Sequence, residues 1–371
     1  MKKDIKILWI HPRLRDYRKP LFDLMDKEYN IKFVFGRKNP DIVDNYNSIY
    51  LSTIRTSLRK LIKLNELKII AKEIKNTDVV ISSFLTNKAT VLAVVLSRLY
   101  GKKIIVWEER WYLGISKRVK RLFDNILSYF VSKGVNSFYV MGEPQYEALL
   151  KLRVKPNKIF TANEYSGFNY SIQKQKQSDI IKKEKKNILY FGRFVEIKGI
   201  EYLIDAFQII EKEYIRTEFV LNIVGTGPLK EALNKRISDL QLNNVFIHNP
   251  VYDVEEKSYL FNNSYIAVIP SIITKNSSAE GGPIVTFEFL SAGLPLIGSN
   301  ALGTRTLFNN YNIGELVNEK SANEIAEAII KLDAKILNGE ISKELVKKEF
   351  AKLPGYNNQF NVLKDAVDFA L

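Results

Sequence analysis

Two cationic side chains lie on one short segment between an apolar run and a helical pattern. The run ILYFG ends at Gly192, Arg193 follows it, and Lys198-Gly199 precedes the next helical stretch. A glycine can adopt the backbone conformation that a tight turn into a helix requires. A guanidinium and an ammonium on one strand-to-helix loop suit the binding of phosphate oxygens, although two solvated loop cations would give the same pattern.

A second segment combines glycines with two carboxylates. Glu280 is followed by Gly281-Gly282-Pro283, and Glu288 comes eight positions after Glu280, inside a helix predicted from residue 284. The glycines would let a ligand approach the backbone, and the N–H groups and positive end of the helix would receive a diphosphate. Both carboxylates could accept hydrogen bonds from sugar hydroxyls. Glu288 lies among apolar residues and could be structural, but a buried carboxylate is costly unless paired, which favours a role.

A third glycine segment, Gly225-Thr226-Gly227-Pro228, ends one apolar run and opens a helical pattern. It is not a full dinucleotide-binding fingerprint, because Lys230 occupies the position of the third glycine. A G-x-G pair alone is a weak signal of nucleotide binding.

Composition excludes several kinds of chemistry. The chain has 371 residues, no cysteine and two histidines, His11 and His248. The absence of cysteine excludes disulfides, thiolate-bound metals and thiol nucleophiles, and it fits a reducing compartment. We expect no metal site and no bound cofactor, and we interpret His248 as a residue at the end of a strand.

The charge is distributed unevenly along the chain. The net charge is +15, and residues 1–170 hold 32 basic and 16 acidic residues, whereas residues 171–371 hold 24 and 25. A basic half indicates an anionic partner, such as a phosphate compound or an anionic membrane surface. A lysine-rich genome would produce the same excess. No RNA-binding motif or helix-turn-helix spacing is present, so nucleic acid is not an expected partner.

Short apolar runs alternate with helical patterns in both halves, which is typical of parallel sheets covered by helices. The length exceeds that of one ordinary core. We therefore predict two doubly wound α/β domains: residues 1–170, a linker at 171–187, and residues 188–340, followed by helices at 341–371 that cross back to the first domain. The predicted strands are 5–10, 31–35, 78–82, 103–107, 136–141, 158–163, 187–192, 218–225, 244–249, 265–270, 294–298 and 312–317.

The predicted helices lie near residues 20–28, 57–76, 87–100, 116–133, 143–152, 199–214, 228–240, 253–263, 284–292 and 321–337. The last of these begins with a capping-box pattern at Ser321 and Glu324. The apolar runs are too short for a membrane span, so we expect a cytoplasmic protein.

The second half resembles the donor-binding domain of retaining glycosyltransferases of family 4, which have the GT-B fold. Five segments carry the resemblance in the expected order: GRFVEIKG, VGTGP, Pro270-Ser271, EGGPIVTFE and FLSAGLPLIGS. Together they cover about residues 187–335. The resemblance implies two Rossmann-like domains facing a central cleft, and transfer of a sugar from a nucleoside-diphosphate sugar with retention of configuration.

The resemblance also assigns roles to individual residues. It implies that Arg193 and Lys198 bind the donor diphosphate and stabilise the leaving group, that Glu280 contacts the donor sugar, and that Glu288 contacts the ribose. Gly282, Pro283, Ile284 and Val285 would lie beside the diphosphate, and residues 248–251 near the base. No D-x-D triplet occurs, in agreement with a metal-independent site.

The first half departs from the family pattern. Many members carry a histidine after the fourth strand, where this chain has Glu108-Glu109-Arg110. We predict that Glu109 takes this position as a catalytic carboxylate, in preference to Glu108. A glutamate that only pairs with Arg110 at a helix start is one alternative, and His11 as the substitute histidine is another.

The first half also contains the segments expected to meet the acceptor. The loop HPRLRDYRKP is cationic, and similar openings occur in glycosyltransferases of cell-surface polysaccharides. Basic amphipathic patterns at 57–76 and 116–130 suit an anionic membrane, although ordinary surface helices look alike. We expect a glycan or lipid-linked acceptor at the inner face of the cytoplasmic membrane. A nucleotide-sugar epimerase and a non-catalytic binding protein are the competing interpretations.

Overall fold

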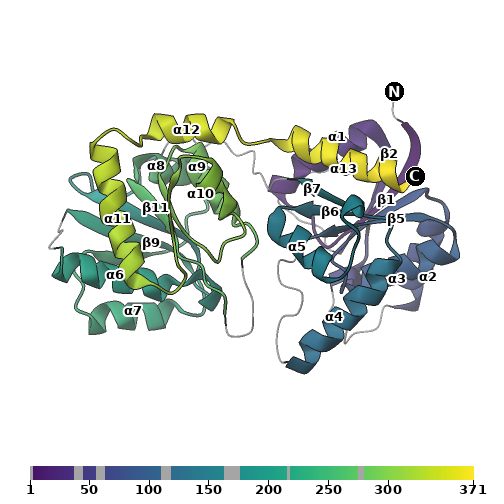
Figure 1. The fold of residues 1–371 in the computed structure, drawn as a ribbon, viewed down its shortest axis with the longest axis horizontal. Helices are drawn as coiled ribbons and strands as arrows, with labels where there is room; N and C mark the ends of the chain where they lie inside the picture. Colours follow the sequence, from purple (N-terminus) through teal and green to yellow (C-terminus); the bar gives the residue numbers. More distant parts are fainter. Residues whose placement is uncertain are drawn as a thin grey trace. The chain divides into compact units, whose positions relative to one another are not determined.

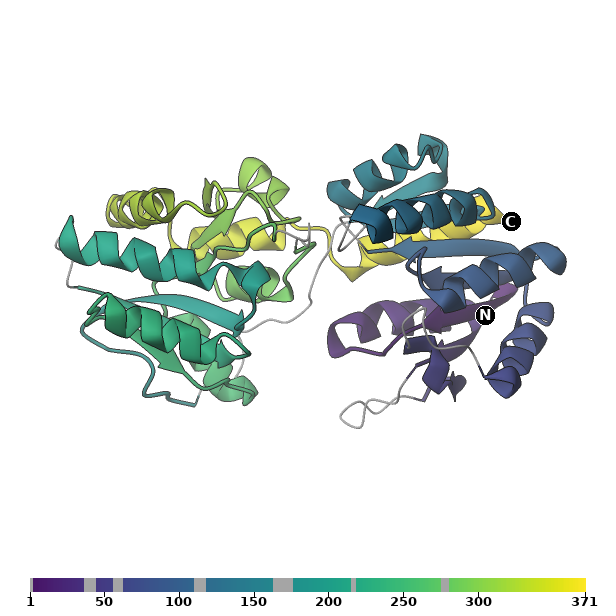
Figure 2. The same ribbon diagram turned by 90° about the horizontal axis from the view of Figure 1, so that it is seen from below.

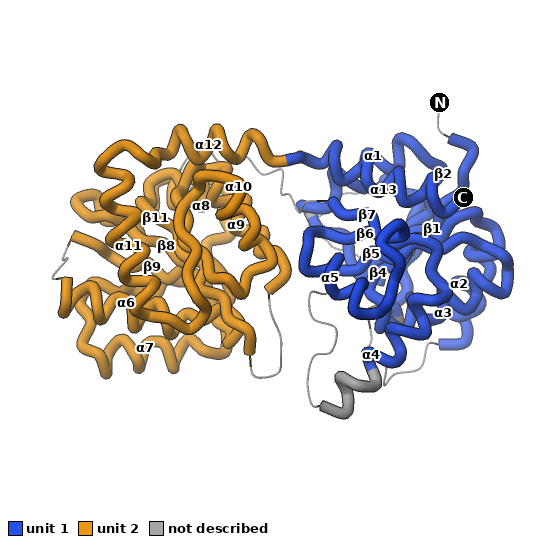
Figure 3. Tube along the Cα trace, viewed as in Figure 1, with its two compact units in different colours: residues 1–167, 354–371 blue, residues 168–353 orange. Residues whose placement is uncertain are grey.

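A computed structural model describes residues 3–36, 45–55, 63–109, 118–162, 176–214, 218–274 and 280–371. The chain divides into two compact units (Figure 3). Residues 1–167 and 354–371 form the first unit, and residues 168–353 form the second.

The first unit is built on a seven-stranded sheet in the order β3-β2-β1-β4-β5-β6-β7 (Figure 1). Every neighbouring pair in this sheet is parallel. Its strands are β1 Lys3–His11, β2 Tyr29–Phe35, β3 Ser48–Tyr50, β4 Val79–Ser83, β5 Lys103–Glu108, β6 Ser137–Met141 and β7 Ile159–Ala162.

Helices cover both faces of this sheet (Figure 2). Successive residues of a strand point to opposite faces, so Ile7 and Trp9 of β1 enter one core, and Leu8 and Ile10 enter the other. The helices of the unit are α1 Lys19–Glu28, α2 Leu64–Lys75, α3 Lys88–Leu99, α4 Arg118–Lys133, α5 Glu143–Lys151 and α13 Tyr356–Ala370.

The C-terminal helix α13 belongs to the first unit. Leu363, Ala366 and Val367 are buried in the same core as Trp9 and Trp107. The Ser137 hydroxyl donates to the Ala366 carbonyl at 2.8 Å, and the Tyr356 hydroxyl donates to the Tyr17 carbonyl at 2.7 Å. The last helix of the chain is thus part of the unit that the first strand opens.

The second unit is built on a six-stranded parallel sheet in the order β10-β9-β8-β11-β12-β13. Its strands are β8 Lys186–Arg193, β9 Phe219–Thr226, β10 Val245–His248, β11 Ile266–Ile269, β12 Leu296–Ser299 and β13 Gly314–Val317. Its helices are α6 Ile200–Lys212, α7 Lys230–Asp239, α8 Val254–Asn263, α9 Ile284–Ser291, α10 Thr306–Asn310, α11 Ala322–Leu337 and α12 Lys343–Ala351.

Both sheets confirm the predicted fold class of parallel, Rossmann-like α/β domains. The helix start predicted at residue 321 is confirmed, since the Ser321 hydroxyl accepts from the Glu324 amide at 3.3 Å and α11 begins at Ala322. The Glu324 carboxylate, however, accepts from the Asn318 amide at 2.7 Å, in place of the second bond of a capping box. The short elements β3 and α10 were not predicted from the sequence.

The segment predicted as a linker differs from that prediction over its described part. Residues 176–187 belong to the second unit, where Ile180 and Ile181 pack against the hydrophobic core and Ser178 donates to Glu256 at 3.0 Å. Two apolar side chains in a lysine-rich stretch are enough to attach it to the core. Residues 171–175 lie outside the described part.

Among the described residues, no helix has both the length and the apolar character that a membrane crossing would require.

Each sheet has one position where the strand order reverses. In the first unit it lies between β1 and β4, and in the second between β8 and β11. Ligands of open α/β sheets bind outside the carboxyl ends of the strands at such a reversal. These two places therefore position any site, and the predicted site residues can be compared with them.

Candidate functional site

The loop after β8 begins at the reversal point of the second sheet. Arg193 is the last residue of β8, is exposed, and makes no ion pair with any other described residue. A short helical turn, Glu196–Lys198, follows, and Gly199 then adopts a left-handed φ of 60° before α6 begins. A Cβ at Gly199 would overlap the Pro270 carbonyl and lie 2.8 Å from Ile272. Glycine is therefore required for this loop to pack against the end of β11.

The glycines at 225 and 227, at the end of β9, pack against the start of the same loop. Both have positive φ angles, 151° and 159°, and Gly225 pairs with Gly192 across the sheet. A Cβ at Gly225 would overlap the Gly192 carbonyl, and one at Gly227 would overlap the Phe194 carbonyl. The G-x-G pair thus allows the backbone that carries Arg193 to lie directly against the end of β9.

Lys198 and Glu280, which are 82 positions apart in sequence, form an ion pair at the reversal point. Their side chains are only 9% and 16% exposed. The second carboxylate oxygen of Glu280 accepts a hydrogen bond from the Ser271 hydroxyl at 2.6 Å. The three residues follow β8 and β11, so the structure brings together the two segments that the sequence assigned to one ligand.

Backbone contacts fix the position of Glu280. The Gly303 amide donates to the Glu280 carbonyl at 3.0 Å, and the Ser299 hydroxyl donates to the Ser271 carbonyl. Gly303 lies so close to Gly281 that a Cβ would overlap the Gly281 carbonyl. The carboxylate is therefore held by the ends of β11 and β12.

Helix α9 begins directly after the glycine pair. Pro283 is its N-cap residue, and no side chain caps its first turn. The first N–H groups of a helix have no partner within the helix, so the turn that begins with Ile284 and Val285 offers backbone donors and a positive dipole end. An anion is the ligand that suits this arrangement. This helix start contains the four residues predicted to lie beside the diphosphate, which are Gly282, Pro283, Ile284 and Val285.

Glu288 lies farther along α9 and is paired with a lysine of α8. Both of its carboxylate oxygens accept from the Lys257 ammonium, at 2.9 and 2.8 Å. The pair explains how a carboxylate with an exposed fraction of 8% is tolerated among apolar residues. Sequence reasoning missed Lys257, although helical spacing places it on the same face as the buried Leu260 and Phe261.

In the first unit, the neighbouring Glu108 and Glu109 differ in burial and in their partners. Glu108 is the last residue of β5, is fully buried, and accepts from the Leu85 amide at 2.9 Å. Glu109 is partly exposed and forms an ion pair with Arg18. Among the described residues, none hydrogen-bonds to the second oxygen of Glu109. The alternative partner Arg110 lies outside the described part of the chain.

His11 is tied into the same cluster. Its Nε2 lies 2.8 Å from Arg18 Nη1, and its Nδ1 lies 2.8 Å from the Ser83 hydroxyl. A guanidinium only donates, so Nε2 accepts and Nδ1 carries the proton. Burial, and then the charge of Arg18, hold the pKa of His11 well below its usual range. A neutral histidine with both nitrogens engaged is a support for Arg18, which favours Glu109 over His11 as the group presented to a ligand.

Arg18 links these groups. Its guanidinium lies over the Trp107 ring, with Cζ 4.7 Å from the centroid. His11 and Ser83 end β1 and β4, and Arg18 and Glu109 follow β1 and β5, so the cluster lies at the reversal point of the first sheet. Of the other cations of this loop, Arg15 is exposed and Arg13 is half-buried.

His248 ends β10 and hydrogen-bonds to Asn222 on the neighbouring strand, at 3.0 Å. Burial lowers its pKa. This geometry agrees with a structural residue at a strand end.

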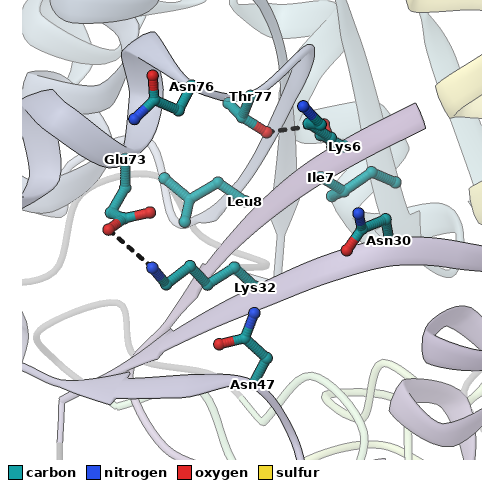
Figure 4. Close-up of a pocket in the computed structure, with 9 residues that line it drawn as sticks. All are labelled: Lys6, Ile7, Leu8, Asn30, Lys32, Asn47, Glu73, Asn76 and Thr77. Carbon is teal, nitrogen blue, oxygen red and sulfur yellow. Dashed lines mark hydrogen bonds and ion pairs between the residues drawn. The ribbon is translucent and has the colours of Figure 1, made fainter. Parts of the chain in front are cut away.

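Two cavities lie away from these clusters. One of about 130 Å³ is lined by Lys6, Asn30, Lys32, Glu73 and Thr77, among others (Figure 4). Another, of about 370 Å³, is lined by residues 182–185, Val220 and Phe246, among others. Both lie near the starts of strands, at the opposite edge from the ligand-binding edge of a parallel sheet. We do not assign either cavity to the candidate site.

Comparison with known proteins shows what the chain is similar to. Residues 171–347 match the family model described as glycosyl transferases group 1. The chain contains a glycosyl transferase group 1 domain. An uncharacterized glycosyltransferase of Haemophilus influenzae is 25% identical over 332 residues, which cover 88% of this chain and 86% of that protein. The Erwinia amylovora amylovoran biosynthesis glycosyltransferase AmsK is 27% identical over 145 residues, or 39% of this chain and 35% of AmsK.

The fold of this chain is also found in solved structures. The Anabaena protein Alr3699/HepE, solved in complex with UDP, superposes with a TM-score of 0.75 at 14% identity, covering 98% of this chain and 99% of that protein. A glycosyltransferase from Rickettsia africae superposes with a TM-score of 0.73 at 16% identity, covering 99% of both chains. The two parallel-sheet units are those of GT-B glycosyltransferases.

Proposed function

We propose that this glycosyltransferase moves a sugar from a nucleoside-diphosphate sugar to a glycan or lipid-linked acceptor, with retention of configuration, in the assembly of a cell-surface polysaccharide. The observation that supports this most is the cluster of Lys198, Glu280 and Ser271 beside the uncapped start of α9. It combines a fixed cation, a fixed carboxylate and backbone donors at one sheet reversal. A diphosphate joined to a sugar presents the complementary groups.

In this proposal each group of the second unit has one task. Arg193, Lys198 and the start of α9 bind the diphosphate and stabilise the charge that develops on the leaving group. Glu280 accepts from a hydroxyl of the donor sugar, and Glu288 accepts from the ribose. The bond between the anomeric carbon and the phosphate oxygen breaks, the acceptor oxygen bonds to the same face of that carbon, and the acceptor proton passes to the departing phosphate. The two cations do the electrostatic work that a divalent metal does elsewhere.

Glu109 is proposed as the reactive-centre carboxylate of the first unit. Arg18 holds one of its oxygens, so the other can accept a hydrogen bond from a sugar hydroxyl. In this role Glu109 replaces the histidine found in many members of the family.

A screen of donors tests the proposal. Nucleoside diphosphates and their sugars are added to the purified protein, beginning with UDP and UDP-glucose because the Anabaena neighbour was solved with both, and thermal unfolding is measured. A bound donor stabilises the folded protein by mass action, by about 2.7 kcal/mol at a hundredfold excess over Kd. We expect one donor class to raise the Tm of the wild-type protein and to raise that of Arg193→Ala much less. Equal stabilisation of both proteins would contradict the assignment of Arg193, and no stabilisation by any donor would contradict the proposed function.

We also propose that the first unit contacts the anionic inner face of the cytoplasmic membrane. Exposed apolar side chains occur on α3 and α4, and Leu99 and Phe130 are 72% and 67% exposed. The ends of these helices are joined, because Arg98 of α3 donates to the Lys133 carbonyl at 2.7 Å. Apolar side chains next to cations suit an anionic bilayer surface. In α2, by contrast, Ile70 and Ile74 are buried, as in an ordinary surface helix.

Vesicle flotation tests this contact. Phosphatidylglycerol vesicles are expected to carry the wild-type protein at low salt, and the Leu99→Ser/Phe130→Ser double variant should bind at least about fivefold more weakly, because two exposed apolar side chains no longer enter the interface. Phosphatidylcholine vesicles serve as the control for charge. Equal flotation of the variant and the wild-type protein would contradict the proposal.

A further inference from the structure

The ion pair between Lys257 and Glu288 is enclosed by aromatic rings. The Lys257 ammonium lies 5.0 Å from the centroid of Phe191 and 5.3 Å from that of Phe261. These two rings meet edge to face at 5.3 Å, and Phe261 also contacts Phe289 of α9 at 4.9 Å. The lysine therefore has little freedom, since its charge is held by two rings and one carboxylate.

A pair of this kind is weak evidence of a role in stability. The desolvation of two charges offsets much of their attraction, and apolar residues of similar volume often stabilise a core as well or better. What the pair does achieve is orientation. When both oxygens of a carboxylate accept hydrogen bonds from one ammonium, the carboxylate cannot rotate freely. An exposed carboxylate, or one held by a single bond, keeps that freedom.

The pairing with Lys257 does not by itself use the full acceptor capacity of the Glu288 carboxylate. An ionised carboxylate offers about four lone-pair sites, and two of them point to Lys257. Glu288 lies one turn after the start of α9, the end where Gly282 and Pro283 precede the first backbone donors. A ligand bound by those donors would meet a carboxylate whose direction is already set.

We propose that Lys257 is a positioning residue of the ribose subsite, which holds Glu288 directed toward the ribose hydroxyls of the donor nucleotide. The inference rests on the proposed function, because it takes Glu288 to be the residue that receives the ribose. Lys257 acts through Glu288 and makes no contact with the donor. Its contribution is thus confined to the part of donor affinity that depends on the ribose hydroxyls.

The experiment compares two probes that differ only in those hydroxyls. UDP, ADP and GDP are titrated calorimetrically into the full-length protein, and the tightest-binding of them is then compared with its 2′,3′-dideoxy analogue. The wild-type protein should prefer the ribonucleotide by about tenfold or more, as expected for hydrogen bonds to a charged acceptor. Lys257→Met and Glu288→Gln should each reduce this preference to less than about threefold. Both should leave the affinity for the dideoxy analogue unchanged.

Further variants separate positioning from a structural role. Lys257→Arg supplies a guanidinium that can donate to both carboxylate oxygens, so it should keep most of the preference for the ribonucleotide. Lys257→Gln should lose that preference. The glutamine variant also provides the test if the methionine variant does not fold. Lys331→Met removes an exposed lysine that pairs with Glu315 on another face and should change nothing. The inference is overturned if the lysine variants weaken both probes equally or keep the wild-type preference. If no nucleotide binds the wild-type protein, the proposed function itself fails.

Discussion

Replacement of Lys198 by methionine is expected to lower the rate of sugar transfer by about 10²–10³-fold, the typical effect of removing one preorganised group that stabilises transition-state charge. The Lys198 side chain is 9% exposed and its ammonium is paired with Glu280, so the variant loses a charge that the fold holds in place. The effect should fall on kcat more than on KM, because the leaving diphosphate gains charge as the glycosidic bond breaks. The measurement is the steady-state release of nucleoside diphosphate from the donor that the screen identifies.

Two variants accompany Lys198→Met. Lys198→Arg keeps the charge with a different shape and should recover part of the rate. Lys331→Met removes an exposed lysine of α11 and should leave the rate unchanged. A Lys198→Met protein that binds and turns over the donor as the wild type does would show that the diphosphate is bound elsewhere.

Replacement of Gly225 by alanine is expected to lower the stability of the second unit by about 3 kcal/mol, because a strained positive φ and a backbone overlap each cost roughly 1–3 kcal/mol. Its φ of 151° disfavours any other residue, and the new Cβ would overlap the Gly192 carbonyl and lie 3.0 Å from the Phe194 ring. For a unit of this size the loss corresponds to a fall of about 6–12 °C in Tm. Scanning calorimetry measures it, with the two units treated as separate transitions.

Gly339→Ala is the matched control for this variant. Gly339 also has a positive φ, 76°, but no atom lies within 4 Å of the position of its Cβ. The control should therefore show only the backbone strain, about 1 kcal/mol for a left-handed alanine. Equal losses in the two variants would contradict the role of Gly225 in bringing β8 and β9 together.

The sequence predicted the parallel sheets because each long strand is a continuous apolar run between turn residues. The strand β3 has three residues, and the helix α10 has five. Segments of this length have too few positions for a periodic pattern, so their existence depends on the surrounding fold. The attachment of residues 176–187 to the second unit was missed because lysine dominates the composition of the segment.

The candidate site was predictable where loop residues follow strands, and less so where helices meet. Arg193 ends β8, Lys198 follows it and Glu280 follows β11. The order of strands alone places such residues at one edge. The partner of Glu288 could not be assigned, because it depends on how α8 packs against α9. For Glu109, strand alternation separates it from the buried Glu108, but the partner Arg18 comes from a loop 91 positions earlier.

A small part of the excess positive charge of the first half lies on and just before α2. Lys63, Lys68, Lys72 and Lys75 are all exposed. In the proposed function, the cations of the second unit bind the donor diphosphate, and exposed lysines of the first unit are candidates for contact with an anionic acceptor or membrane.

Proton NMR of a reaction mixture tests the central claim most directly. The wild-type protein is mixed with the stabilising nucleotide sugar and an acceptor glycan, and the donor and product anomeric signals are followed. The account predicts that the donor is consumed, that the product keeps the anomeric configuration of the donor, and that Glu280→Gln consumes it at least about a hundredfold more slowly. A product of inverted configuration, or equal consumption by Glu280→Gln, would contradict it.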